Sequence, residues 1–209
     1  MGTKKLTILG FSAPTITMIM DAMQSNRDLA ELHIINNLHA EASCDYSNAE
    51  FSVVFSQEPP EDSSGFFLGV YKASTKMKVH ELFPHECITL VHATAHVSTA
   101  ASLGSGCLLN SNCSVAAHAK IGRHVSINRN SSVGHHTMVG DFSTINPGAH
   151  IAGFAELGRA VTVGMGSCVL DGVKVGDGSV IGAGSVVTKD IPAGVVAFGA
   201  PCRVVKRKE

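Results

Sequence analysis

Aliphatic side chains recur at every sixth position through the second half of the chain, without a break. A period of six fits neither an α-helix, with about 3.6 residues per turn, nor an ordinary strand, whose side chains alternate with a period of two. It is typical of a hexapeptide repeat, in which each repeat forms one wall of a parallel β-helix and turns its aliphatic side chain inward. We therefore predict a left-handed parallel β-helix. The seventeen positions are Val91, Val97, Leu103, Leu109, Val115, Ile121, Ile127, Val133, Val139, Ile145, Ile151, Leu157, Val163, Val169, Val175, Ile181 and Val187.

Two neighbouring positions of the repeat fit the same coil. The residue after the aliphatic one is often glycine or asparagine, as at Gly122, Asn128 and Gly134, and these residues tolerate the positive φ that we expect at a corner. Two residues before the aliphatic position the side chain is usually small, as at Ser131 and Ser143, so that a narrow prism can close. Three walls of six residues give a coil of eighteen, so residue i is expected to pair with residue i+18 at about 4.8 Å.

The first part of the chain lacks this period. Its apolar runs predict strands at 4–9, 32–35, 51–55 and 66–71, a helix from Pro14, and a second helix at 76–83. This order implies a small, Rossmann-like α/β unit, which either binds a ligand at the carboxyl ends of its strands or only caps the solenoid. We expect three parts: the α/β subdomain at 1–86, the β-helix at 87–190 and a C-terminal tail at 191–209.

Composition narrows the class of partner. The chain has 16 basic and 17 acidic residues and no basic run before 206–208, which argues against nucleic acid. No apolar stretch reaches the roughly 18 residues of a membrane span, and we expect neither a signal peptide nor a myristoylation site at the start. The six cysteines include no Cys-x-x-Cys pair, so we expect reduced thiols and a cytoplasmic protein.

Histidines are the polar exceptions within the repeats, and histidine is the side chain best suited to move a proton near neutral pH. His135, two residues after an aliphatic position, should point outward, and Gly153 stands one coil above it. A glycine there leaves a groove beside the imidazole and exposes a backbone N–H. A base next to a main-chain donor is the arrangement that acyl transfer needs. The alternative is that each of these histidines is a surface residue without a catalytic role. His118, His124, His135, His136 and His150 all lie within the repeats.

Residues 128–141, with the sequence Asn-Arg-Asn-Ser-Ser-Val-Gly-His-His-Thr-Met-Val-Gly-Asp, resemble the catalytic segment of bacterial hexapeptide-repeat sugar acyltransferases. This group contains the sialic acid O-acetyltransferases and the N-acetyltransferases of nucleotide-linked 4-amino sugars. The resemblance extends through 145–149, 152–153, 182–187 and 199–201, and the N-terminal unit is similar in plan. It implies acetyl-CoA as the acyl donor, no metal, and a homotrimer with active sites between subunits.

The resemblance also implies roles for particular residues. His135 falls on the catalytic base, Asn128 on an asparagine that helps arrange the site, and Gly153 on the glycine whose N–H faces the thioester carbonyl. The acetyl-CoA arm would run along the later coils toward the tail, where glycines permit its close approach. Its implied contacts are Gly153, Gly164, Met165, Gly182, Ala183, Ala200 and Pro201. Candidate substrate contacts are Gly10 and Ser12 in the first turn, Asn37 and Lys72 after later strands, and His136.

Three features depart from the family pattern. His136 stands where the family usually places Asp or Glu to orient the catalytic imidazole and raise its basicity, so either Asp141 or a residue of the next subunit substitutes, or the base is weaker. The first turn carries Phe11 and Pro14 instead of a glycine-rich run, and the amides at 36–37 replace an acidic pair. The last two departures concern the acceptor substrate rather than the reaction.

The leading hypothesis is N-acetylation of a nucleotide-linked sugar in surface-glycan biosynthesis, by direct attack on the thioester. One alternative is O-acetylation of a sialic-acid-like sugar. Another is a γ-type zinc carbonic anhydrase, in which three histidines converge between subunits. The last is a non-catalytic β-helix scaffold that binds no acetyl-CoA. The chemical nature of the acetylated product would distinguish N- from O-acetylation. A stoichiometric zinc content would indicate the carbonic anhydrase, and a failure to bind acetyl-CoA would indicate the scaffold.

Overall fold

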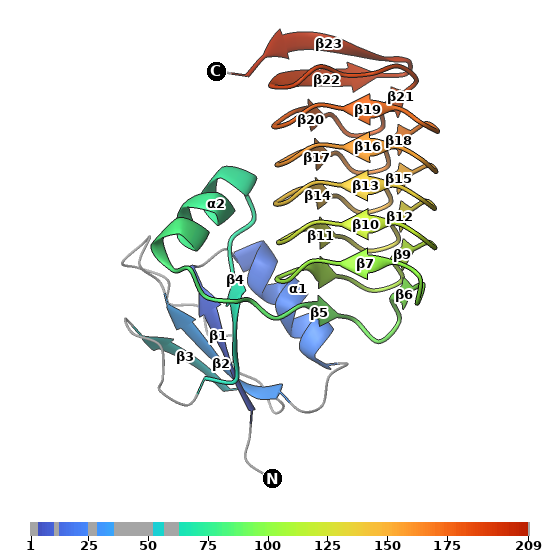
Figure 1. The fold of residues 1–209 in the computed structure, drawn as a ribbon. Helices are drawn as coiled ribbons and strands as arrows, with labels where there is room; N and C mark the ends of the chain where they lie inside the picture. The colour runs from blue at the N-terminus through green and yellow to red at the C-terminus, as the bar shows by residue number, and fades with distance from the viewer. Residues whose placement is uncertain (1–3, 11–12, 25–28, 36–51, 57–62, 209) are drawn as a thin grey trace.

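The computed structural model describes residues 4–10, 13–24, 29–35, 52–56 and 63–208. From Leu90 onward the chain winds into a three-walled solenoid of stacked coils, with a smaller α/β unit beside its first coils (Figure 1). Two-residue strands pair in parallel with the strands eighteen residues on, as Ser126–Ile127 does with Thr144–Ile145. The parallel β-helix and its register, both expected from the period of six, are therefore confirmed.

The strands form three walls. Wall 1 consists of β5 (Leu90–Val91), β8 (Leu108–Leu109), β11 (Ser126–Ile127), β14 (Thr144–Ile145), β17 (Thr162–Val163), β20 (Val180–Ile181), β22 (Val195–Gly199) and β23 (Cys202–Arg207). Wall 2 consists of β6 (His96–Val97), β9 (Ser114–Val115), β12 (Ser132–Val133), β15 (His150–Ile151), β18 (Cys168–Val169) and β21 (Val186–Val187). Wall 3 consists of β7 (Ser102–Leu103), β10 (Lys120–Ile121), β13 (Met138–Val139), β16 (Glu156–Leu157) and β19 (Lys174–Val175). The corners that follow these walls are called edge 1–2, edge 2–3 and edge 3–1.

The repeating aliphatic side chains fill the prism. From Leu109 to Val187 all fourteen are at most 4% exposed, so each coil covers the one below it. In the first coil Val91, Val97 and Leu103 are only partly buried. The interior is thus one continuous apolar column along the solenoid axis.

Small hydroxyl side chains close the corners. Where the residue two positions before the aliphatic one is Ser or Thr, its hydroxyl donates to a corner carbonyl, which belongs to the next coil in every case except Ser185. Ser143 Oγ, for example, donates to Gly158 O and accepts from Val161 N–H, both at 2.9 Å. These side chains therefore satisfy backbone groups that the short strands leave unpaired, in addition to being small.

Positive φ values do not lie where the glycine pattern predicted them, and the expectation for Gly122, Asn128 and Gly134 is wrong. The glycines after the aliphatic position are instead required because they lack a Cβ. A Cβ added at Gly140 would lie 2.5 Å from the carbonyl carbon of Gly158 in the next coil. The positive-φ residues come two positions later, and the non-glycine ones among them are Asn112, His118, His124, Asn130, His136, Phe142, Phe154 and Ala160.

The N-terminal unit is a parallel sheet of strand order β3-β2-β1-β4 with two helices. Each predicted element is present, with bounds that differ by at most three residues. Because the chain returns to the far side of β1 after β3, the sheet has a switch point between the carboxyl ends of β1 and β4, where such sheets bind ligands. The elements are β1 (Lys4–Leu9), α1 (Ala13–Gln24), β2 (Leu29–Ile35), β3 (Ser52–Ser56), β4 (Gly65–Leu68) and α2 (Ala73–Leu82).

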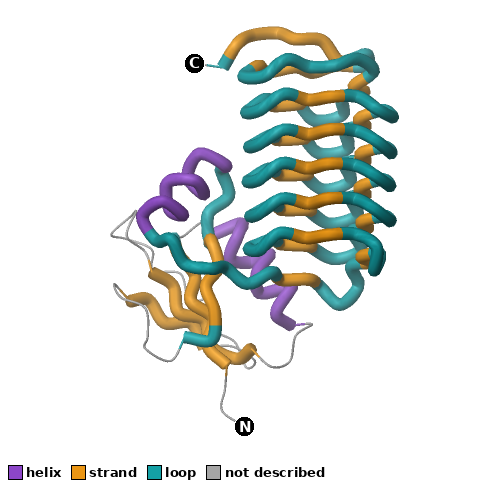
Figure 2. Tube along the Cα trace, viewed as in Figure 1, coloured by secondary structure: helices purple, strands orange, loops and turns teal. Residues whose placement is uncertain are grey.

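The α/β unit packs on wall 1 of the first coils (Figures 1 and 2). Helix α1 lies against β5 and β8, and Leu6 and Ile8 of β1 share one apolar core with Leu90 and Leu108 of the solenoid. After β4, the Tyr71 hydroxyl donates to Asn146 Oδ1 on edge 1–2. The packing thus holds the switch point of the sheet next to edge 1–2.

The solenoid ends in a hairpin. Strand β22 pairs in parallel with β20, and β23 runs antiparallel to β22. The turn between them contains Ala200 and Pro201, both exposed, and Gly199 N–H donates to Ser185 Oγ at 3.1 Å, which places the turn over edge 1–2. The division of the chain after residues 86 and 190 stays a prediction.

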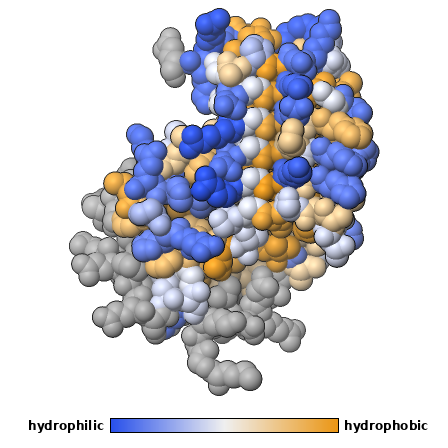
Figure 3. All heavy atoms as spheres, viewed as in Figure 1, coloured by the Kyte–Doolittle hydropathy of each residue, from blue (hydrophilic) through white to orange (hydrophobic). Residues whose placement is uncertain are grey.

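Hydrophobic side chains on the face shown in Figure 3 form a narrow stripe up the solenoid, flanked by hydrophilic ones. Three large exposed apolar side chains stand on the edges: Phe154 and Leu170 on edge 2–3, and Met165 on edge 1–2. Neither helix within the described ranges is long and apolar enough to span a bilayer.

Candidate active site

The imidazole of His135 lies against the backbone of Gly153, one coil above it on edge 2–3. His135 is exposed at the corner after β12. A Cβ added at Gly153 would lie 2.6 Å from His135 Cε1 and 2.8 Å from His135 Nε2. The missing side chain therefore makes the space that the ring occupies, and Nε2 faces the glycine.

The other ring nitrogen of His135 is held by its neighbour. His135 Nδ1 lies 3.3 Å from His136 Nδ1, so one of the two donates a hydrogen bond and the other accepts it. The His136 ring stacks on Phe154, with ring centroids 4.9 Å apart and planes 18° apart, and it also contacts the His118 ring at 4.7 Å. This stack fixes His136, which in turn orients His135.

Asp141 does not orient His135, so that expectation is wrong within this chain. It lies on edge 3–1, where its carboxylate accepts from Arg123 N–H at 2.7 Å and from the Arg123 guanidinium at 2.9 Å. Partial burial acts to raise the pKa of Asp141, but the hydrogen bonds and charge of Arg123 outweigh it and leave the pKa below its usual value. The carboxylate is already engaged on another edge.

Asp171 is the carboxylate that the structure places at His135, and sequence reasoning missed it. Its Oδ1 would lie 3.0 Å from a Cβ added at Gly153, the same point that the His135 ring approaches from below. The signal was present in the register, because Asp171 follows Gly153 by one coil and His135 by two. The three residues form one column on edge 2–3.

The backbone N–H of Gly153 has no hydrogen-bond partner among the described residues. At the equivalent corner position on edge 3–1, Arg123 N–H and Arg159 N–H donate to aspartates one coil above. An open main-chain donor beside an oriented imidazole can bind a carbonyl oxygen while the imidazole takes a proton. The arrangement therefore suits acyl transfer.

The structure does not bring Asn128 to His135 within one chain. Asn128 is 2% exposed on edge 1–2, where its Oδ1 accepts from Asn110 Nδ2 at 3.3 Å. Its Nδ2 is buried and has no partner in the described part of the chain. In this chain Asn128 belongs to the wall of the solenoid, and its role in the chemistry stays a prediction.

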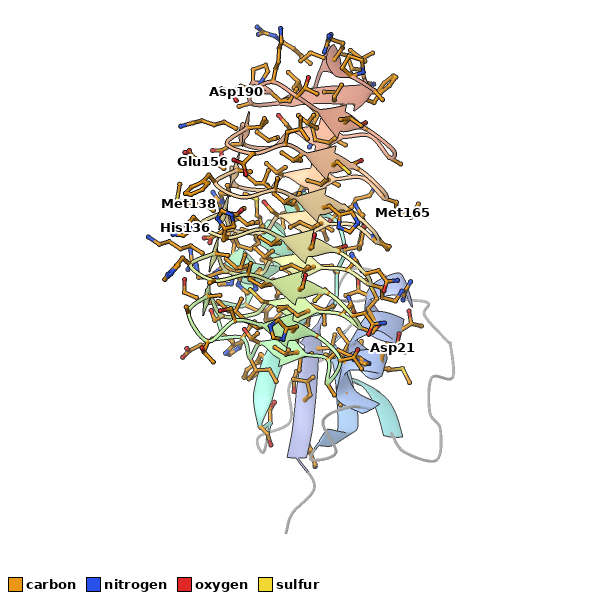
Figure 4. All side chains as sticks on the ribbon, turned by 90° about the vertical axis from the view of Figure 1, so that its right-hand side faces the viewer. Asp21, His136, Met138, Glu156, Met165 and Asp190 are labelled. Carbon is orange, nitrogen blue, oxygen red and sulfur yellow. The ribbon has the colours of Figure 1, made fainter. Side chains whose placement is uncertain are left out.

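Apart from Gly153, the residues expected along acetyl-CoA form a strip on edge 1–2, away from His135. Met165 is 58% exposed, Ala183 is exposed one coil above it, and the turn of Ala200 and Pro201 follows. Figure 4 shows Met165 and His136 on opposite sides of the solenoid. These exposed side chains could line an extended acyl donor, although no contact among the described residues of one chain brings the strip to the imidazole.

Gly164 and Gly182 are not open to a ligand in the way the sequence suggested. A Cβ at Gly164 would lie 2.4 Å from Ala183 N, and one at Gly182 would lie 2.7 Å from Phe198 Cβ. Protein atoms fill both spaces, so the reason given for these glycines is wrong. Close stacking of coils requires them.

The described substrate candidates of the N-terminal unit lie at the switch point. Gly10 is buried with φ of 79°, next to Gly69, whose added Cβ would lie 2.4 Å from Gly10 O. Lys72 is exposed at the start of α2. Ser12 and Asn37 lie outside the described residues. The switch point thus offers a tight backbone turn beside one exposed cation.

A buried basic cluster joins α2 to edge 3–1, and the sequence did not reveal it. Lys76 is 4% exposed and its Nζ donates to His124 O at 3.1 Å and Ser126 Oγ at 2.7 Å. Burial lowers the pKa of Lys76 to about 8. Burial, followed by the neighbouring His80 and Lys76, lowers the pKa of His124 to about 4. The cluster connects the two parts of the chain and lies away from His135.

Metal ligation was the other chemistry open to the histidines. Within the described ranges, no three His, Cys, Asp or Glu side chains are grouped as ligands of a metal ion.

The fold and the column on edge 2–3 define a hexapeptide-repeat β-helix with an oriented, exposed imidazole. Residues 154–189 match the family described as bacterial transferase hexapeptide (six repeats). No curated protein sequence matches the chain.

Among solved structures, the chain is similar to the acetyltransferase domain of PglB from Neisseria gonorrhoeae, at 24% identity over 98% of this chain and 100% of that one, with a TM-score of 0.86. It is similar to PerB from Caulobacter crescentus, at 21% identity over 97% of each chain, with a TM-score of 0.83. WeeI from Acinetobacter baumannii is 20% identical over 97% of this chain and 99% of that one, with a TM-score of 0.75. These similarities confirm the left-handed β-helix with its α/β unit.

Proposed function

We propose that the protein transfers an acetyl group from acetyl-CoA to an amino group of a nucleotide-linked sugar, as a step of surface-glycan biosynthesis. The observation that carries the proposal is the His135 ring against Gly153, whose N–H is open, with the Cε1–Nε2 edge of the ring nearest the glycine and Nδ1 held by His136. His135 Nε2 accepts the proton of the attacking amine. Gly153 N–H donates to the carbonyl oxygen as that oxygen gains charge. The amine attacks the thioester directly, so no covalent enzyme intermediate is needed.

The site is completed between the subunits of a homotrimer. The base lies on edge 2–3, whereas Met165, the hairpin turn and the switch point lie along edge 1–2. Edge 2–3 of one subunit against edge 1–2 of the next brings the base next to the strip for the donor and the switch point for the acceptor. Three such contacts close a ring. The exposed Phe154, Leu170 and Met165 provide apolar surface for them.

The compared structures support the choice of substrates. The PglB domain was solved with acetyl coenzyme A, and PerB with CoA and GDP-perosamine. By analogy, we propose acetyl-CoA as the acyl donor and a nucleotide-linked amino sugar as the acceptor for this chain. The five cysteines within the described ranges are free thiols, which suits a reducing compartment, and we infer a cytoplasmic protein.

Replacing His135 with alanine tests the base. We expect turnover of a panel of nucleotide-linked amino sugars, GDP-perosamine among them, to fall by about 10²–10⁴-fold, the usual contribution of a general base. Assembly and acetyl-CoA affinity should stay those of the wild type, because the side chain is exposed. Release of coenzyme A measures turnover. Sedimentation measures the assembly state, and calorimetry measures the affinity for acetyl-CoA.

His150→Ala is the matched control, since His150 is an exposed histidine of the next coil whose Nδ1 contacts only Ser132 Oγ among the described partners. It should retain turnover. Near-full turnover in His135→Ala would refute the assignment of the base.

A further inference from the structure

We infer that Asp171 recognises the acceptor as an ammonium ion and thereby selects an amine over a hydroxyl group. This inference rests on the proposed acyl transfer and names the residue that decides its acceptor class. It assigns a specificity role to a carboxylate two coils away from His135 in the same column of edge 2–3.

The first support is that Asp171 is an exception among the aspartates of the later coils. Three others each accept a hydrogen bond from a backbone N–H of the coil below, at 2.7–2.8 Å: Asp141 from Arg123, Asp177 from Arg159 and Asp190 from Lys174. Asp171 stands in the equivalent register above Gly153, yet neither a hydrogen bond nor an ion pair holds it within the described part of the chain. Its charge is therefore available.

The second support is the direction of the two side chains. His135 Nε2 approaches Gly153 from the coil below, and Asp171 Oδ1 approaches it from the coil above. Each atom lies within 3.0 Å of the position that a Cβ added at Gly153 would take. Lys189 follows Asp171 by one coil but forms no ion pair with it among the described residues. A base and an unpaired carboxylate thus flank Gly153, one from the coil below and one from the coil above, and an acceptor bound beside Gly153 would meet both.

Acid–base chemistry assigns the two groups different tasks. A sugar amine enters near neutral pH mainly as –NH₃⁺, and Asp171 holds it by a charge-assisted hydrogen bond. One proton passes to solvent, and the freed lone pair forms the C–N bond as the C–S bond breaks. His135 Nε2 takes a second proton from the nitrogen and gives it to the departing sulfur. The products are the amide, the thiol and one released proton.

A hydroxyl acceptor can donate a hydrogen bond to this carboxylate, but it carries no positive charge for the carboxylate to stabilise. The same carboxylate opposes the oxyanion that forms at Gly153, and an ammonium beside it cancels that repulsion. The column on edge 2–3 is therefore suited to amines and poorly suited to alcohols.

Asp171→Asn tests the inference, since asparagine keeps the shape and the acceptor oxygen but removes the charge. With the full-length protein and the panel of nucleotide-linked 4-amino sugars, we expect kcat/KM to fall by about tenfold or more, mainly through KM. That size follows because an opposite charge within about 4–6 Å is worth one to three pKa units. Acetyl-CoA affinity, measured by calorimetry, should be unchanged.

Asp177→Asn is the matched control, because Asp177 occupies the same corner position on edge 3–1 and caps Arg159 N–H at 2.8 Å. It should keep wild-type kcat/KM. Sugars with a hydroxyl group in place of the amine should show no loss of rate in Asp171→Asn.

Two results would overturn the inference alone: amine turnover by Asp171→Asn at the wild-type kcat/KM, or a loss that follows a weaker acetyl-CoA affinity. If the wild-type protein acetylates no acceptor, or His135→Ala keeps its turnover, the proposed function fails and the role of Asp171 fails with it.

Discussion

At the scale of single residues, the absence of a side chain at Gly153 creates the space on which the site depends. In Gly153→Ala the three atoms nearest the new Cβ would all be side-chain atoms, among them His135 Cε1 at 2.6 Å and Asp171 Oδ1 at 3.0 Å. We expect the imidazole to be displaced and turnover to fall by about 10²-fold, as misplacement of a reacting group by about 1 Å does. The free energy of unfolding in urea should change by less than about 1 kcal/mol, because both side chains are exposed and can be displaced into solvent.

Gly164→Ala is the contrasting variant on edge 1–2. Its Cβ would lie 2.4 Å from Ala183 N, a backbone atom that cannot give way without shifting a coil. The unfolding free energy should therefore fall by about 1–3 kcal/mol. Equal losses of stability in the two alanine variants would contradict the distinction between a glycine for the site and a glycine for stacking.

The sequence predicted the pairing of His135 with Gly153 because a strict period converts position into height along the solenoid. The same arithmetic leads to Asp171, but the family pattern directed attention to the residue next to His135. The corner conformation was mispredicted because glycine has two properties, a free φ and no Cβ. At Gly140 only the second one is used, while His136 and Phe154 adopt the positive φ.

At the scale of elements, a hydrogen-bond ladder links coils whose strands are only two residues long. Ser143 is fully buried, and Ser143→Ala leaves both Gly158 O and Val161 N–H without their partner. We expect a loss of about 1–3 kcal/mol in unfolding free energy, the cost of unsatisfied buried groups. Urea titration at one protein concentration measures it.

Ser132→Ala is the control for the ladder, since Ser132 is at least partly exposed and bonds only to His150 Nδ1 among the described residues. It should change stability by less than about 0.5 kcal/mol. A loss as large as that of Ser143→Ala would refute the special role of the buried hydroxyls. The sequence predicted that these side chains are small, but their bonds depend on the carbonyls of another coil, which no local pattern shows.

At the scale of the whole molecule, the junction of α2 with edge 3–1 makes stability depend on pH. The folded pKa of His124 is about 4, against an ordinary value of 6.5. Between these values the unfolded chain binds more protons than the folded one, so stability is lost as the pH falls from 6.5 to 4. The loss amounts to about 3 kcal/mol at most, since each pKa unit corresponds to about 1.36 kcal/mol.

Unfolding measured at pH 7 and pH 4.5 checks this prediction. His124→Asn places a residue that accepts positive φ at the same corner and removes the titrating ring, so its stability should vary less over this range. An unchanged dependence in the variant would show that other groups cause it. The sequence could not predict the junction, because Lys76 and His124 meet only once the α/β unit is docked on the solenoid.

The register of eighteen also governs how such a chain can change in length. His135, Gly153 and Asp171 occupy three successive rungs, so their spacing survives the gain or loss of an entire turn elsewhere along the axis. A single inserted residue within those rungs would rotate every later wall by part of a turn and separate the three side chains. Insertions and deletions that keep the site intact must therefore comprise whole coils of eighteen residues, and they must lie outside the three coils that carry His135, Gly153 and Asp171.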